Sequence, residues 1–222
     1  MALNAHDSVR QADVGEILSA LARHEGSASH SYPIMKLSAG AAVARDLADA
    51  VHYLCTLHGR QPGVIDLAAT RPASPRVNDW AGAAVAGFAR ERAYLTRVVV
   101  AAGPLPSTPG QAESEAAVIG QRHALEMLAR SDRAGCALGA AMALVLDWRA
   151  IRSVLDAAAK RFSVDAPVCL LPNADETGEA AAALVDHPRV ERALMFGAQQ
   201  ILIQQRGLWD LLESRQQARK DY

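Results

Sequence analysis

The chain has 222 residues, of which 50% are hydrophobic, with a formal net charge of −1 and three cysteines. This apolar content excludes a disordered chain, and so few cysteines exclude a small disulfide-stabilised scaffold. The balanced charge provides no basic field for nucleic acid or for an anionic membrane, so neither partner is expected. The length suits one large domain or two small ones, and the helical pattern described below predicts a single domain over residues 1–222.

The amino-terminal sequence and the cysteines favour a cytoplasmic protein. The opening residues MALNAHD lack a basic segment followed by an apolar one, so no signal peptide is expected. The longest uncharged run, residues 134–146, is shorter than the roughly 20 residues that span a bilayer and predicts a tightly packed buried helix. Cys55, Cys136 and Cys169 show no C-x-x-C spacing, which is typical of reduced thiols.

Helix-start and helix-stop residues recur along the chain, whereas strand patterns are nearly absent. Asp13-x-x-Glu16 and Asn173-x-x-Glu176 have capping-box spacing, and Thr108-Pro109 combines an N-cap with a first-turn proline. A further helix is expected to begin at Ser38. The predicted helices cover residues 13–25, 38–59, 79–102, 108–130, 132–162, a short segment after Asn173, and 188–214.

The segments between these helices carry most of the prolines. Loops are expected near residues 60–78, with a short helical turn at 64–69, and near residues 163–175, and the amino terminus is expected to be loosely ordered. Alanine is abundant and lets helix axes approach closely, and Gly135-x-x-x-Gly139 also indicates close packing. The sequence therefore predicts an all-α antiparallel bundle of about five long and two or three short helices.

Helical phase identifies polar residues that interrupt otherwise apolar faces. Glu91, Asp147, His58 and Gln205 project toward the predicted core, whereas Asp49 and His52 lie far from the apolar stripe of their helix. The pair Arg149 and Arg152 is also expected on a solvated face. A buried carboxylate requires an ion pair, a hydrogen bond, a raised pKa or a metal. The four inward residues, together with His123 on the predicted fourth long helix, are therefore the candidates for a ligand-binding or buried polar network.

Two interpretations of the inward carboxylates remain open. In the first, each carboxylate pairs with one of the many arginines. In the second, Glu91 and Asp147 belong to a metal or substrate site, because alternating helices place both about 20 Å from the same end of the bundle. His123 falls within about two turns of that level and is the third candidate ligand for iron or manganese.

Ferritin-like di-iron proteins offer the obvious comparison for the second interpretation. They use two E-x-x-H pairs and a glutamate from each of two other helices. This chain has no E-x-x-H pair. The most similar patterns are Asp49-x-x-His52 and the reversed His123-x-x-Glu126. The metal alternative is therefore a degenerate ferritin-like oxidase or hydroxylase.

The stretch from FARERAYLTRVVVAAGPLP through RHALEMLARSDRAGCALGAAMALVLDWRAIRSVLDAAA, residues 88–159, resembles uncharacterised all-helical proteins of alphaproteobacteria. The resemblance implies a bacterial helical protein of unknown function. It also implies a more distant relationship to the ferritin-like superfamily. It transfers no active-site residue, because the stretch contains no catalytic motif.

The leading functional hypothesis is a non-catalytic binding or interaction protein without a cofactor. The last helix carries Met195, Leu202 and Trp209 at seven-residue spacing beside its main apolar stripe. This seam predicts a homo-oligomer through that helix, with an unidentified small ligand as the other expected partner.

Overall fold

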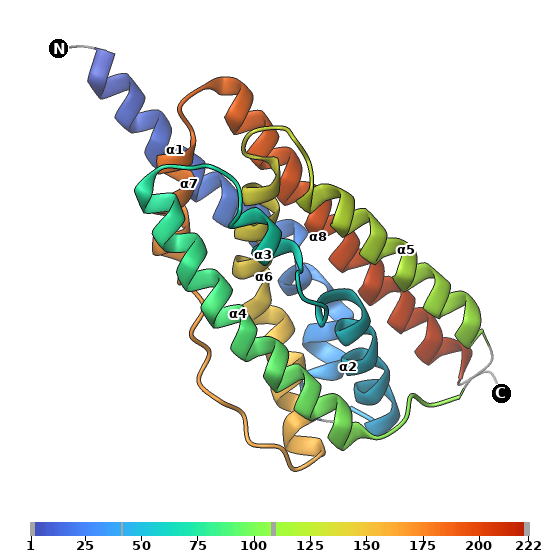
Figure 1. Ribbon diagram of the computed structural model, residues 1–222. Helices are drawn as coiled ribbons and strands as arrows, with labels where there is room; N and C mark the ends of the chain where they lie inside the picture. Colours follow the sequence, from blue (N-terminus) through green and yellow to red (C-terminus); the bar gives the residue numbers. More distant parts are fainter. Residues whose placement is uncertain (1–2, 41, 108–109, 220–222) are drawn as a thin grey trace.

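The computed structural model describes residues 3–40, 42–107 and 110–219, with side chains from residue 14 onward in those ranges. The described residues contain helices and loops but no strand (Figure 1), as the sequence predicts, and none of the described helices is long and apolar enough to cross a membrane. The elements are α1 (Leu3–Glu25), η1 (Ser27–Ser29), the π-helical η2 (Tyr32–Leu37), α2 (Ala44–His58), α3 (Val64–Ala68), α4 (Pro75–Ala102), α5 (Gln111–Ala129), α6 (Cys136–Arg161), α7 (Ala174–Leu184) and α8 (Pro188–Ala218).

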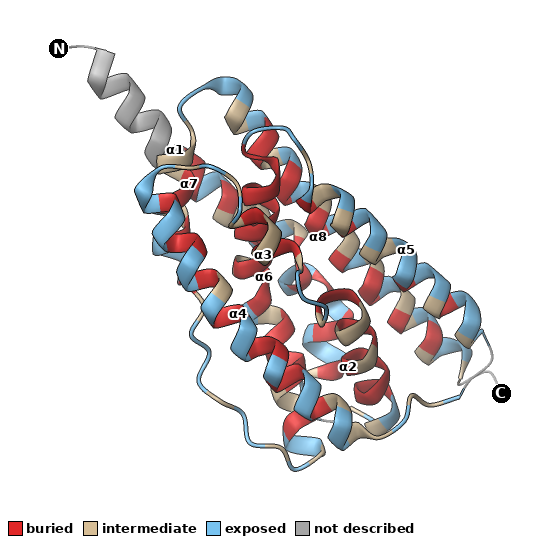
Figure 2. Ribbon diagram, in the orientation of Figure 1, coloured by how far each residue is buried: buried red, intermediate tan, exposed pale blue. Residues whose placement is uncertain are grey.

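Helix α6 lies at the centre of the bundle, and its buried residues cover nearly its whole circumference (Figure 2). The uncharged run at its start is buried from Cys136 to Val145, as predicted. From α4 to α8, with the shorter α7 included, each helix runs opposite to the one before it (Figure 1). Helices α4, α6 and α8 therefore share one direction (Figure 1), and the packed neighbours α6 and α8 are parallel.

Two helix starts differ from the prediction. Helix α1 begins at Leu3, so Asp13 lies inside the helix rather than at its amino-terminal cap. The helix expected from Ser38 begins at Ala44. The Ser38 hydroxyl donates to the Pro33 and Ile34 carbonyls, both at 2.9 Å, and so closes the turn of η2. Gly40, with φ of +81°, then separates η2 from α2.

Other helix boundaries are close to their predicted positions. Asn173 and Glu176 form the expected capping box at the start of α7, and Pro188 is the first residue of α8. Helix α3 lies within the predicted 60–78 loop, and α7 begins at the end of the 163–175 loop. The expected helix from residue 132 begins instead at Cys136, after Gly135 with φ of +92°. The predicted cap at Thr108-Pro109 lies outside the described residues.

Glycines allow α6 and α8 to pack backbone against backbone. A Cβ atom built on Gly139 would lie 2.1 Å from the Leu194 carbonyl oxygen, and one on Gly197 would lie 2.0 Å from the Cys136 carbonyl oxygen. Gly135 meets Val190 in the same way, so the predicted role of Gly135-x-x-x-Gly139 in close packing is confirmed.

The predicted oligomerisation seam of the last helix is not a free surface. Leu202 and Trp209 are fully buried within the bundle, and Met195 is half-buried. The seam therefore widens the contact of α8 with the core. Phase within one helix could not distinguish these two uses of an apolar stripe.

We expect Gly139→Ala and Gly197→Ala each to lower the free energy of unfolding by about 1–3 kcal/mol, because the added methyl group would overlap backbone atoms of the facing helix. The matched controls are Gly82→Ala and Gly120→Ala, where a Cβ would meet no atom within 4 Å. These should stabilise by about 0.5–1 kcal/mol through helix propensity alone. Urea unfolding of the four variants measures the difference, and equal effects would contradict the backbone contact.

Candidate functional site

Glu91 lies in a buried ion pair between α4 and α6. Its Oε1 accepts a hydrogen bond from Arg152 Nη1 at 2.7 Å, and its Oε2 accepts one from Trp148 Nε1 at 2.9 Å. Arg152 also donates to Asp156 at 2.7 Å and stacks over the Tyr94 ring at 4.4 Å. The prediction that Glu91 points inward is confirmed, whereas the solvated position predicted for Arg152 is wrong. Arg152 is buried because α4 covers the face of α6 that single-helix phase assigns to water.

The loop between α6 and α7 closes the outer side of this pair. Arg152 donates to the Pro167 carbonyl oxygen, and a Cβ on Gly87 of α4 would lie 2.8 Å from the Leu170 carbonyl oxygen. Cys169 is exposed on this loop. Partial desolvation nevertheless raises the pKa of the Cys169 thiol, against the lowering effect of the Leu171 backbone, and the nearby Glu91 carboxylate raises it further. A raised thiol pKa lowers the thiolate fraction, so Cys169 has none of the activation of a nucleophilic cysteine.

Asp147 lies in a second buried network that joins α6 to η1. Its Oδ1 accepts from the Ser27 backbone N–H at 2.7 Å, and its Oδ2 accepts from the Ser27 hydroxyl at 2.6 Å. Trp209 Nε1 of α8 donates to the same hydroxyl oxygen at 2.8 Å. The preceding Gly26 leaves room for the carboxylate, since a Cβ there would lie 2.4 Å from Asp147 Oδ1. Asp147 thus connects three elements without an ion pair.

His58 and Gln205 extend this network toward α2. His58 Nε2 donates to Gln205 Oε1 at 2.7 Å, and because a carbonyl oxygen only accepts, the proton of neutral His58 lies on Nε2. Gln205 Nε2 is buried without a well-formed hydrogen bond, although the Gln205 side chain lies close enough to Asp147 to lower the pKa of that carboxyl. The His58 ring meets the Trp148 ring edge to face at 5.7 Å.

Burial perturbs both titratable groups of this network. Desolvation raises the pKa of Asp147 to about 6, even though hydrogen bonds from Ser27 and Gln205 lower it. Desolvation also lowers the pKa of His58 to about 4, against the raising effect of its hydrogen bond to Gln205. In both cases the surroundings favour the neutral form.

The predicted metal-ligand set does not come together. Asp147 and Trp148 are consecutive on α6, so their side chains diverge, and Trp148 rather than Asp147 meets Glu91. His123 is exposed on α5, whereas Glu91 and Asp147 are buried. No group of three or more His, Cys, Asp or Glu side chains with metal-binding geometry occurs in the described part of the chain.

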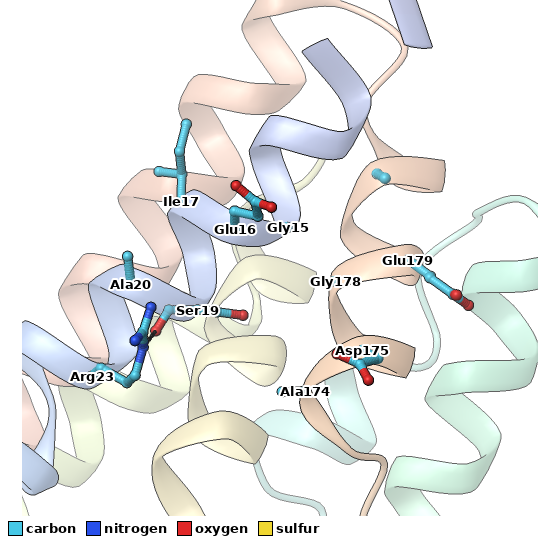
Figure 3. A pocket seen from close by; sticks show the side chains of 11 residues that line it. Gly15, Glu16, Ile17, Ser19, Ala20, Arg23, Ala174, Asp175, Gly178 and Glu179 are labelled. Atoms are coloured by element: carbon cyan, nitrogen blue, oxygen red, sulfur yellow. Dashed lines mark hydrogen bonds between the residues drawn. The ribbon is translucent and has the colours of Figure 1, made fainter. Parts of the chain in front are cut away.

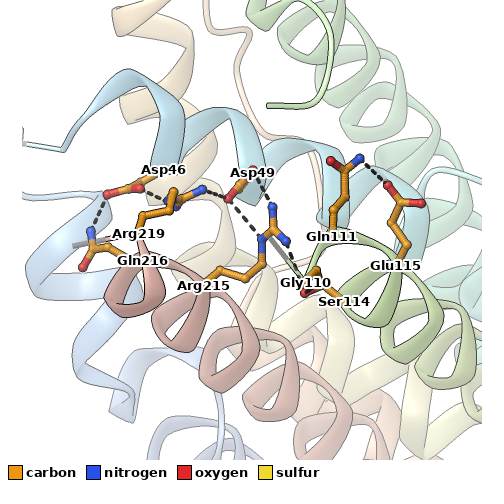
Figure 4. A network of polar contacts seen from close by, with 9 residues as sticks. All are labelled: Asp46, Asp49, Gly110, Gln111, Ser114, Glu115, Arg215, Gln216 and Arg219. Atoms are coloured by element: carbon orange, nitrogen blue, oxygen red, sulfur yellow. Dashed lines mark hydrogen bonds and ion pairs between the residues drawn. The ribbon is translucent and has the colours of Figure 1, made fainter. Parts of the chain in front are cut away.

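A third buried network, between α2 and the end of α8, was missed by the sequence analysis (Figure 4). Arg215 Nε donates to Asp49 Oδ2 at 3.2 Å, and Arg219 bridges Asp49 and Asp46, with its Nη2 2.6 Å from Asp46 Oδ1. Asp49 is fully buried, so its predicted solvated position is wrong. The face of α2 opposite its apolar stripe is covered by α8, and only the arginines at residues 215 and 219 could have indicated a partner. His52 is half-buried and bonds the Gly103 carbonyl oxygen at 2.8 Å.

A fourth pair, also missed, fixes α3 against α4. Arg92 donates two hydrogen bonds to Asp66, at 2.8 and 3.0 Å. Asp66 Oδ2 also accepts from the Gly63 backbone N–H at 2.8 Å. A bidentate arginine–carboxylate pair of this kind is a strong, directional contact.

The surface contains hollows that are separate from these networks. One of them, about 940 Å³, is an open hollow between α1 and α7 (Figure 3). Its floor is the crossing of the two helices, where a Cβ on Gly15 would lie 2.8 Å from Gly178 Cα. Glu16, Arg23 and Glu179 on its sides carry charges of both signs.

The α5–α8 groove is a smaller and more apolar hollow, of about 410 Å³, between two antiparallel helices. Their direction follows from two contacts, since Arg215 Nη1 donates to Ser114 Oγ at 3.2 Å, and a Cβ on Gly207 would lie 2.8 Å from Gln121 Nε2. Two exposed hydrophobic side chains, Met127 and Phe196, are among its lining residues. The groove is lined by Ala124, Leu125, Met127, Leu128, Ser131, Arg133, Cys136, Phe196, Gln200 and Gln204.

We expect Glu91→Leu to lower the free energy of unfolding by about 3–5 kcal/mol, because Arg152 is then buried without its charge partner. The matched double variant Glu91→Leu/Arg152→Met should recover most of this loss, since it removes both charges. Urea denaturation of the two variants and the unmodified protein measures these changes in the free energy of unfolding. A double variant as unstable as the single one would contradict a paired role for Glu91.

We expect Asp147→Asn to stabilise the protein more at about pH 8 than at about pH 4.5, by about 2 kcal/mol. The folded-state pKa of Asp147, about 6, is raised above its ordinary 3.8. The associated stability is therefore complete below the unfolded pKa and is lost as the pH rises through 6. His58 has the opposite dependence, with stability lost as the pH falls toward 4, but it titrates in both proteins. Chemical denaturation across this range tests the difference, and a pH-independent gap would refute it.

Comparison with known proteins gives a family but no function. No curated protein and no solved structure matches this chain. The model of a family of unknown function, DUF6975, matches residues 22–220, which include every network described above. The chain therefore belongs to this family of unknown function.

Proposed function

We propose that this protein is a non-catalytic interaction protein that binds a helical segment of a partner in the α5–α8 groove. The observation that carries this proposal is the gathering of exposed hydrophobic side chains on the two helices. Met127, 73% exposed, and Phe196, 44% exposed, line the groove, and Ile203 (47%) and Ile119 (41%) lie on the same two helices outside its lining. Large apolar side chains grouped on one face of a folded chain are typical of an interaction site.

The shape of the groove favours a helical occupant. Ile119, His123 and Met127 are spaced at i, i+4 and i+8 on α5, and Phe196 and Ile203 at i and i+7 on α8, so each set forms a stripe along its helix. Two antiparallel helices with such stripes receive the apolar face of a third helix. Met127 adds a flexible side chain that adapts to different apolar partners.

The buried polar groups support a non-catalytic function without a cofactor. Glu91 is engaged by Arg152 and Trp148, and Asp147 by Ser27. None of the four buried residues predicted for the site lines either hollow described above. A substrate in these hollows would not reach the groups whose pKa values are perturbed. We place the interaction in the cytoplasm, where the three free cysteines would stay reduced.

We expect Met127→Glu to weaken the binding of a synthetic amphipathic helical peptide by at least about tenfold, which is 1.4 kcal/mol. The carboxylate would replace the apolar contact between Met127 and the peptide, and it would have to lose water to enter the groove. Fluorescence anisotropy with labelled peptides of leucine-striped sequence measures the affinity, in buffers with and without a chelator.

Val100→Glu on α4 is the matched control, because Val100 is 75% exposed and lies outside the groove. It should leave the affinity unchanged. The absence of saturable binding by every peptide, or equal losses in the two variants, would refute the proposed function. An affinity that disappears with the chelator would refute its independence from metal.

A further inference from the structure

We infer that the helical segment bound in the α5–α8 groove is acidic on the two flanks of its apolar stripe. This inference rests on the proposed function and adds the chemistry of the partner. It is carried by the arginines that surround the groove and by the ion pairs that neutralise the carboxylates nearby.

Four exposed arginines lie around or beside the apolar stripes. Arg130 ends α5, and Arg133 lines the groove just before α6. On α8, Arg192 lies one turn before Phe196, and Arg206 follows Ile203 by three residues. Within the described part of the chain, none of the four guanidinium groups forms an ion pair. Their charges are therefore available to a partner.

Arg133 is already positioned by the groove itself. Its guanidinium carbon lies 5.6 Å from the centre of the Phe196 ring. Stacking on an aromatic ring restrains a guanidinium while leaving its N–H groups free to bind a carboxylate in a bidentate manner. A carboxylate bound there would lie beside the apolar floor, as at the edge of an acidic amphipathic helix.

The carboxylates of this region are already directed to other arginines. Glu126 Oε1 lies 3.6 Å from Arg122 Nε and 4.0 Å from Arg60 Nη1. Asp132 lies 3.7 Å from Arg71. The surroundings of the groove are thus positively charged although the whole chain has a net charge of −1. Complementarity therefore favours a negatively charged segment.

The same charges disfavour a second copy of the chain as the occupant. A twofold contact uses one patch on both subunits, so the arginines around the groove would face the arginines of the partner copy. Like charges opposed at an interface are destabilising. An acidic helix provides the apolar contact without this repulsion.

The test compares two labelled helical peptides with the same leucine stripe, one with glutamate and one with lysine at every polar-flank position. We expect the glutamate peptide to bind the unmodified protein at least about tenfold more tightly, with an affinity that falls as salt is added. The variant Arg130→Glu/Arg133→Glu/Arg192→Glu should reverse the preference.

The matched control Arg45→Glu/Arg90→Glu/Arg149→Glu changes the net charge equally at exposed arginines outside the groove. It should keep the preference for the glutamate peptide. Equal binding of both peptides that Met127→Glu abolishes would overturn the acidic partner but leave the proposed function standing. Failure of both peptides to bind would overturn both. A dimer in sedimentation that Met127→Glu dissociates would overturn the inference by identifying a second copy as the occupant.

Discussion

The close approach of α6 and α8 is the contact on which the other elements depend. Gly139 and Gly197 place the two backbones side by side, and the small residues of the buried start of α6 keep the neighbouring helices near its axis. At this distance no water layer separates the helices. Every polar side chain on α6 that faces inward must therefore be satisfied by the protein itself.

The polar networks of the core follow from this requirement, and they meet it in different ways. Glu91 and Arg152 neutralise one another, as do Asp46 and Asp49 with Arg215 and Arg219, so these networks bury paired charges. Asp147 has only neutral donors, and burial raises its pKa to about 6. The Asp147 network connects η1, α6 and α8, while its extension through Gln205 reaches His58 on α2. This network holds the four elements together, and the free-energy cost of burying it depends on whether Asp147 is protonated.

Core and surface therefore have separate tasks in this protein. The networks occupy the inward polar groups, and the proposed binding activity lies in a groove that none of them lines. The polar residues that helical phase identifies in the sequence, such as Glu91 and Asp147, form the buried networks that stabilise the fold. The groove residues, such as Met127 and Phe196, are ordinary apolar residues until two helices bring them together.

The sequence alone determined the helical class, the loops near residues 60–78 and 163–175, the capping box of α7, the glycine contact of α6 and the inward direction of Glu91, Asp147, His58 and Gln205. These properties depend on local spacing and helical phase within one segment. Only the tertiary structure decided which partners these groups find, that Asp49 and Arg152 are buried, and that His123 is exposed. Phase within one helix gives the direction of a side chain relative to its own apolar stripe. Burial depends on which neighbouring helix covers that direction, and the chain order does not specify that neighbour.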